Sequence, residues 1–403
     1  MRLHTLTYLD EGDHVVVGRT DTDSYAVFPR DASALLRRIE AGASMVEAAD
    51  WYLRTYGESV DIAEFERTLR EFDFVRAENP SPTAAIIDSD SKPVRWQRLG
   101  RALFGGTAWI CYAAVVAAAI VVMAARPRLI PHTSNLFFTH YVTLIALTLF
   151  LGQFPLLFLH EGFHGLAGRR LGLRTRLRVS NRIYFVVLET RMDGLVVKPR
   201  RQRYLPMLAG MLADVLAISV LTLVAAPGLR ADGTVAPVAA VCLALAFATS
   251  LRLVWQFFFH LRTDLYYVAI VVLGCQDLHA AAKLILANRL RRLFGRPVVD
   301  EARLYPRDRA IGRWYSWLLL IGYTFSLSTF AFAAMPALIR SVGITVGRFT
   351  QPGLTLPRVL DSVVFLSLTG GQFLFAGYLA ARRRWRARAA DSPSPQSDRR
   401  NAS

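Results

Sequence analysis

The segment Leu156-Leu-Phe-Leu-His-Glu-Gly-Phe-His-Gly165 places ionisable residues within an apolar run long enough to cross a membrane. His160 and His164 are four residues apart, so on a helix both imidazoles face the same side and can hold one metal ion. Glu161 stands beside them, where it can take a proton from a water molecule on that ion. Such residues are costly inside a membrane and are usually functional there. The alternative is a pair of histidines that bond neighbouring helices.

Composition favours a membrane protein, since 53% of the 403 residues are hydrophobic. The formal net charge is +17, and the basic residues gather at the ends of apolar segments. This placement follows the positive-inside rule, so no nucleic-acid partner is needed to explain the charge. The first 30 residues carry several acids and no long apolar core, which excludes a signal peptide there. The basic clusters are 92–101, 169–178, 198–203, 289–296 and 382–388.

The sequence predicts an α-helical polytopic membrane protein with about six spans in a domain at 101–383, each span long enough for about 30 Å of hydrocarbon. With the basic clusters inside, the chain lies in the cell membrane with both termini in the cytosol. The second span then runs inward and brings the two histidines toward the cytosolic face. The expected spans are roughly 104–125, 137–168, 205–227, 235–258, 314–338 and 359–381.

Residues 1–78 predict a small α+β domain of winged-helix size. Short β-like runs at 3–9, 14–17 and 25–28 precede amphipathic helices near 31–40, 45–56 and 62–73. Ser44 and Asp61 are each followed three residues later by a glutamate, which is the pattern of a capped helix start. A linker at 79–100 and a disordered tail at 384–403 complete the expected division. The predicted core is Leu35, Leu36, Ile39, Val46, Ala49, Tyr52, Leu53, Phe65, Leu69, Phe72 and Phe74.

A catalytic zinc needs a third protein ligand and an open position for water. Asp264 is the preferred candidate, because it follows the fourth span directly and lies at the depth inferred for His164. Asp193, next to Gly194, is the second candidate, although a turn aspartate is its simpler interpretation. His260 stands four residues before Asp264 and is a rival ligand or a partner of one.

The apolar run 183–188 is too short to span and predicts a membrane-associated strand or a re-entrant hairpin near the site. Edge strands of this kind can receive an extended peptide.

The motifs resemble those of the site-2 intramembrane metalloproteases, and within them the bacterial peptide zinc metalloproteases. His160-Glu-Gly-Phe-His164 matches the family's HExxH, and Thr263-Asp-Leu-Tyr-Tyr267 is similar to its downstream aspartate phrase. The resemblance covers roughly 100–300 and implies a Zn²⁺ ion held by His160, His164 and Asp264, with Glu161 as the base. Leu265 replaces the family's glycine, and Phe258-Phe259 stands where an Asn-Pro pair is common.

Residues 1–75 are similar to the peptide-recognition elements typified by pyrroloquinoline-quinone biosynthesis protein D. Such elements bind an extended leader peptide along a β-edge beside a helix. A DNA-binding winged helix is the alternative, which the many acids at 31–75 disfavour.

These expectations combine into a membrane-embedded zinc endopeptidase that cleaves a peptide or membrane-protein substrate, with a leader-bearing precursor peptide as one class. Partners in peptide modification or export fit the resemblance. The alternative function is a proteolytically inactive membrane protein that binds a peptide or assists its export.

Overall fold

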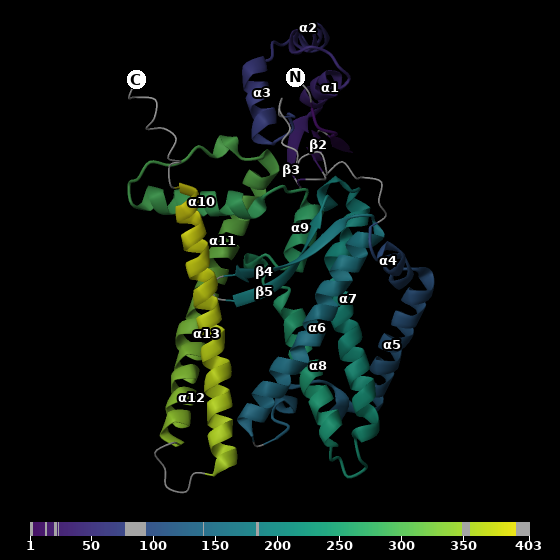
Figure 1. Ribbon diagram of the computed structural model, residues 1–403, viewed down its shortest axis with the longest axis vertical. Coiled ribbons are helices and arrows are strands. Elements are labelled where there is room, and N and C mark those ends of the chain that lie inside the picture. Colours follow the sequence, from purple (N-terminus) through teal and green to yellow (C-terminus); the bar gives the residue numbers. More distant parts are fainter. Residues whose placement is uncertain are drawn as a thin grey trace, which may run out of the picture.

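A small N-terminal unit sits on one end of a long helical bundle in the computed structural model (Figure 1). The structure describes residues 3–12, 14–19, 22, 24–76, 94–139, 141–182, 185–348 and 355–391. Most of the predicted linker and the last twelve residues of the predicted tail, 392–403, lie outside these ranges.

The N-terminal unit contains the three strands and three helices that the sequence predicts. The antiparallel sheet has the order β1-β2-β3 and pairs Val16 with Val27 in its second ladder. Ser44 and Glu47 form the expected capping box, and the Asp61 side chain accepts a hydrogen bond from the Glu64 amide. The elements are β1 (Thr7–Glu11), β2 (His14–Arg19), β3 (Ser24–Pro29), α1 (Arg30–Glu40), α2 (Met45–Tyr56) and α3 (Ile62–Glu71).

The core of this unit differs from the prediction on α2. Leu35, Leu36 and Leu69 are fully buried as expected. Val46 and Leu53 are instead 72% and 50% exposed, so their assignment to the core was wrong. The reason is rotational: α2 turns the stripe of Ala48 and Tyr52 toward α1 and the core, and Val46 and Leu53 lie on another face of the same helix.

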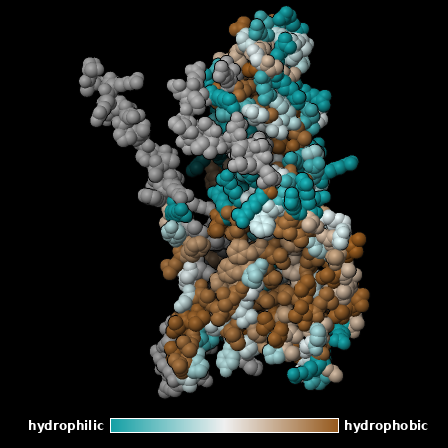
Figure 2. Space-filling view, turned by 45° about the vertical axis from the view of Figure 1, so that its right-hand side comes forward, coloured by the Kyte–Doolittle hydropathy of each residue, from teal (hydrophilic) through white to brown (hydrophobic). Residues whose placement is uncertain are grey.

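The remaining chain is a helical bundle with an apolar outer surface. Within the described residues, five helices are long and apolar enough to cross a membrane, namely α5, α6, α7, α8 and α11. The bent pair α9 and α10, which meet at 89°, would make a sixth span if counted as one. Figure 2 shows the apolar band over the bundle below a polar end, consistent with a multi-pass membrane protein. The helices are α4 (Gln97–Leu103), α5 (Gly106–Ala125), α6 (Val142–Arg170), α7 (Arg200–Ala225), α8 (Pro237–Trp255), α9 (Asp264–Leu273), α10 (Leu278–Leu293), α11 (Pro306–Thr329), α12 (Met335–Arg348) and α13 (Leu356–Asp391).

Several predicted boundaries need correction. The predicted span at 314–338 begins earlier, at Pro306, and passes through a π-helical turn at Phe330–Ala334 into α12. The predicted span at 359–381 lies within α13, in which the described residues give only the shorter apolar stretch Val359–Leu368. Helix α13 continues to Asp391, so the tail boundary at 384 falls inside a helix; Arg and Ala are good helix formers there. Likewise, α4 begins within the predicted linker.

A β-hairpin separates α6 from α7. Strands β4 (Arg174–Arg182) and β5 (Phe185–Asp193) pair antiparallel and cross obliquely over the bundle (Figure 1). The predicted strand at 183–188 is therefore part of a longer hairpin, and residues 183 and 184 lie outside the described ranges. The Cβ of an alanine at Gly168 would lie 2.9 Å from a Thr175 methyl carbon, so this glycine lets the hairpin pack closely on α6.

The tip of the β1–β2 hairpin joins the N-terminal unit to the bundle. Glu11 accepts a hydrogen bond from Arg203 and lies 3.5 Å from the Nε of Arg200. The rings of His14 and Tyr305 meet edge to face at 5.7 Å. Strands β1 and β2 also touch the 3₁₀ turn η4 (Leu195–Val197), which follows the second hairpin.

Candidate metal centre

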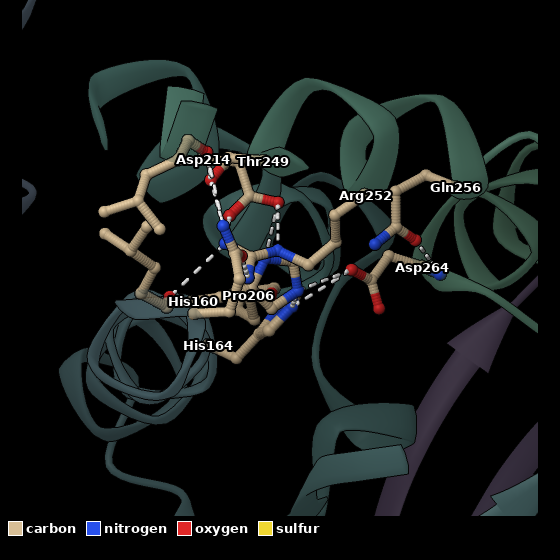
Figure 3. A network of polar contacts seen from close by, with 11 residues as sticks. His160, His164, Pro206, Asp214, Thr249, Arg252, Gln256 and Asp264 are labelled. Carbon is tan, nitrogen blue, oxygen red and sulfur yellow. Dashed lines mark hydrogen bonds and ion pairs between the residues drawn. The ribbon is translucent and has the colours of Figure 1, made fainter. Parts of the chain in front are cut away.

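Three predicted ligands, from two helices, meet at one point. His160 and His164 project from the same face of α6, and Asp264 stands at the start of α9 (Figure 3). Oδ2 of Asp264 is 3.2 Å from Nε2 of each histidine, and the two Nε2 atoms are 3.3 Å apart. Both imidazoles are buried. This His-His-Asp group could hold a metal ion.

The spacing of these donor atoms fits a small divalent cation. Ligands about 2.0–2.1 Å from a tetrahedral zinc ion are about 3.3–3.4 Å apart, and the three distances here are 3.2, 3.2 and 3.3 Å. Three protein ligands leave one tetrahedral position for water or substrate. Two imidazoles and one carboxylate form a donor set typical of catalytic zinc.

Hydrogen bonds at Nδ1 orient both rings. Nδ1 of His164 is 2.7 Å from the carbonyl oxygen of Pro206 on α7. A carbonyl only accepts, so Nδ1 carries the proton and Nε2 of the neutral ring offers its lone pair. His160 is held in the same way, with Nδ1 3.0 Å from Oδ2 of Asp214.

Helix α7 leaves room for an ion because it carries Gly210 at this level. A Cβ placed on Gly210 would lie 2.2 Å from Nε2 of His164 and 2.5 Å from Nε2 of His160. These separations are close to metal–ligand bond lengths. The absence of a side chain at Gly210 therefore preserves the space that a metal ion would need.

Glu161 is fixed by β5, the second strand of the hairpin between α6 and α7. The hydroxyl of Thr190 on β5 is 2.8 Å from Oε2 of Glu161 and 3.0 Å from its backbone oxygen. The glutamate is buried next to both histidines and lines the same cavity. Its carboxylate is thus placed beside the ligand group, as the sequence predicts for a general base.

No protein-family model, curated protein or solved structure matches the chain. The chemistry of the site is therefore inferred from its own donor atoms and their surroundings.

The two rival ligands lie elsewhere. Asp193 ends β5 and faces Arg176 at 3.9 Å, outside the ligand group. His260 lies in the 3₁₀ turn η6 (Phe259–Leu261), with Nε2 2.9 Å from the Ser326 hydroxyl. The prediction that His260 could share a helical face with Asp264 was wrong, because Arg262 adopts a left-handed conformation and α9 begins only at Asp264.

The backbone before Asp264 is held by Gln256. The Asp264 amide donates to Oε1 of Gln256 at 3.0 Å, and the Thr263 hydroxyl donates to the Gln256 carbonyl at 2.6 Å. These bonds fix the break between α8 and α9, so that α9 starts at the level of the histidines. Gln256 thus supports the position of Asp264 from the end of α8.

The sequence analysis did not identify two further charged residues at the site. Asp214 on α7 contacts His160, and Arg252 on α8 forms an ion pair with Asp214 (Figure 3). The available signal was their position, since charged side chains within apolar spans are usually functional.

A cavity of about 890 Å³ opens beside the ligand group. Its walls include the ligands and Glu161, residues 187–192 of β5, and the turn before α9. His279 and Tyr323 also line the cavity, and Nε2 of His279 is 3.3 Å from the Tyr323 hydroxyl oxygen. The volume is sufficient for several residues of an extended peptide.

Proposed function

We propose that the chain is a membrane-embedded zinc metalloendopeptidase of the site-2 protease type, acting on a peptide or membrane-protein substrate. The observation that carries the proposal is the meeting of His160, His164 and Asp264 beside Glu161, within a cavity of an apolar helical bundle. The donor atoms have the identity and the spacing that zinc prefers. Copper, iron and nickel also accept imidazole, and zinc is favoured by the tetrahedral spacing of the donor atoms.

The residues divide the chemistry between them. When bound, a zinc ion would supply a Lewis acid that acidifies a water molecule and polarises a peptide carbonyl. Glu161 would act as the general base for the attacking water and then as the general acid for the leaving amine. Thr190 donates to the Glu161 carboxylate and fixes the direction of its oxygens. Asp214 and Pro206 hold the two imidazoles with Nε2 toward Asp264.

An extended peptide suits this site better than an intact helix, because a helix hides its amides from attack. Strand β5 lines the cavity and carries Thr190 beside the catalytic glutamate. The N-terminal unit rests on the same end of the bundle through η4, and Leu195 and Val196 of η4 also line the cavity. A leader-bearing precursor peptide held by this unit would therefore reach the site over a short distance. Proteins that modify or export such a peptide would be partners of the enzyme.

The proposed orientation puts both termini in the cytosol of a cell-membrane protein. The basic cluster at 169–178 covers the end of α6 and the start of β4, on the side of the N-terminal unit. Helix α13 ends on that side too (Figure 1). Basic residues on one side of a bundle mark its cytosolic face.

The test separates metal binding from catalysis. Glu161→Gln should keep about one zinc per chain, yet lower the hydrolysis of fluorescein-labelled casein in detergent by at least about a hundredfold, because a general base contributes 10²–10⁴-fold. Glu71→Gln, on an exposed surface of α3, is the matched control and should behave as wild type. Unchanged turnover in Glu161→Gln would refute the role of Glu161. Zinc without cleavage in wild type would favour the inactive peptide-binding alternative.

A further inference from the structure

Asp214 is a carboxylate in the middle of an apolar helix and is only 1% exposed. A buried charge is costly unless it is paired. Oδ2 of Asp214 lies 3.0 Å from Nδ1 of His160. The other ring nitrogen, Nε2, faces Asp264, on the opposite side of the imidazole. Asp214 therefore reaches the ligand group through the ring of His160 and is not itself placed to bind the same ion.

Arg252 neutralises this carboxylate with a two-pronged contact. Its Nη2 is 2.5 Å from Oδ1 of Asp214, and its Nε is 3.2 Å from Oδ2. Such paired bonds between guanidinium and carboxylate fix both orientation and charge. The guanidinium also donates to Oε1 of Gln153 at 3.1 Å and to the Leu156 carbonyl at 3.4 Å. Arg252 on α8 thus links α7 to α6, the helix that carries both histidines.

We propose that Asp214 and Arg252 act as a pair of positioning residues that hold His160 in its metal-binding tautomer; the inference rests on the proposed metal centre. Asp214 accepts a hydrogen bond from the protonated Nδ1 of His160, and the lone pair of the neutral ring is then on Nε2. A carboxylate in this position also makes the imidazole a stronger ligand. Arg252 pairs with both oxygens of this carboxylate and fixes its rotation.

The two ligand histidines differ in this respect. His164 is oriented by the neutral carbonyl of Pro206, whereas His160 faces a paired carboxylate. A backbone carbonyl cannot be removed by a side-chain substitution, but the Asp214 contact can. Loss of Asp214 should therefore weaken the metal site through His160 alone and leave the orientation of His164 intact.

The expected losses follow from these contacts. Removal of an outer hydrogen-bond partner typically lowers metal affinity by 10–100-fold, so Asp214→Ala and Arg252→Met should each weaken binding by about that factor. Asp214→Asn keeps an acceptor without the charge and should lose less. Arg252→Lys keeps the positive charge but cannot make both bonds to Asp214, so its metal affinity should lie between those of wild type and Arg252→Met.

The experiment uses the full-length protein in detergent, stripped of metal and titrated with Co²⁺ against a chromophoric chelator. The dissociation constant reports affinity, and the visible Co²⁺ spectrum reports the ligand geometry. Ser219→Ala is the control on the same helix, because the buried Ser219 hydroxyl bonds only to its own helix, at the Val215 carbonyl, among the contacts described. It should bind as wild type, while the Asp214 and Arg252 variants should bind more weakly and with a shifted spectrum.

A double variant adds a second criterion. If Arg252 acts through Asp214, the double variant Asp214→Asn with Arg252→Met should lose little more metal affinity than the more affected single variant. If the two residues act independently, the two fold-losses in affinity should multiply. Wild-type affinity and spectrum in Asp214→Asn, Arg252→Lys and Arg252→Met would overturn the proposal and leave the metal centre standing. Wild-type protein that takes up no Co²⁺ would refute the metal centre itself. If Asp214→Ala does not fold, these three conservative variants decide the question.

Discussion

At the scale of single residues, Gly210 keeps open the space beside the two ligand histidines. It stands on α7 where any side chain would meet both Nε2 atoms. The backbone of α7 is therefore part of the wall behind the metal position, and Pro206 and Asp214 of the same helix orient the rings.

Gly210→Ala should abolish metal binding, because its methyl group would occupy the space between the two imidazoles. A Cβ at 2.2 Å from Nε2 of His164 forces that ring or α7 to move. Gly162→Ala on α6 is the control, since a Cβ there meets nothing within 4 Å. Zinc analysis of both purified variants checks the expectation, and wild-type zinc in Gly210→Ala would contradict the assigned metal position.

The third ligand can be tested by a second pair of substitutions. Asp264→Ala should weaken zinc binding strongly, by a hundredfold or more, because it removes an anionic ligand from the group. Asp193→Ala should leave zinc binding unchanged, because Asp193 lies at the end of β5, near Arg176. Chelator competition ranks the two variants, and the reverse order would move the ligand to Asp193.

The ligands were predictable from the sequence, whereas their support was not. His160, Glu161 and His164 share a local spacing, and Asp264 was preferred over Asp193 and His260 because it stands beside an apolar run. Asp214 and Arg252 are separated from His160 by 54 and about 92 residues, and only the packing of α6, α7 and α8 brings them together. No spacing rule connects residues on three different helices.

At the scale of elements, the hairpin of β4 and β5 carries the groups that work with the ligands. Thr190 of β5 holds Glu161, and neighbouring residues of β5 line the cavity. The sequence predicted a short membrane-associated strand or a re-entrant hairpin here. It did not predict the long partner strand, because Arg174, Arg176 and Arg178 in β4 look like a basic cluster at a membrane edge.

Thr190→Val should lower the turnover number several-fold to about tenfold and leave zinc content intact. Valine preserves the shape and removes the hydroxyl, and one such hydrogen bond is worth about 0.5–1.5 kcal/mol. Thr175→Val on β4 is the control, since its hydroxyl bonds to Arg169 and not to Glu161. Rates with labelled casein together with metal analysis check the prediction. If Thr190→Val lost zinc in the same proportion as turnover, Thr190 would support the ligand group instead of Glu161.

At the scale of the whole molecule, the N-terminal unit is docked on the bundle and not merely tethered. Glu11 and Arg203 are 11% and 8% exposed at the side chain, so the contact between the two parts is largely buried. The sequence predicted the unit and its caps from local patterns. It gave no sign of this docking, because the pair is 192 residues apart in the chain.

Glu11→Ala should loosen the docking, because it leaves the Arg203 guanidinium buried without its carboxylate. Breaking a buried pair costs about 3 kcal/mol or more, on the order of a hundredfold in the docked equilibrium. Glu66→Ala removes the half-exposed partner of the exposed Arg70 and should cost about 0–1 kcal/mol. Hydrogen exchange at β1, β2 and η4 checks this; equal protection in both variants would show that the contact does not hold the unit in place.

The proposed metal centre is tested most directly by the zinc content of the purified full-length protein and of its His160→Ala and His164→Ala variants. The two histidines provide two of three ligands from one turn of α6. We predict about one zinc per chain in wild type and in Asp193→Ala, and almost none in either histidine variant. Wild-type zinc content in both histidine variants would contradict the metal centre, and with it the proposed peptidase.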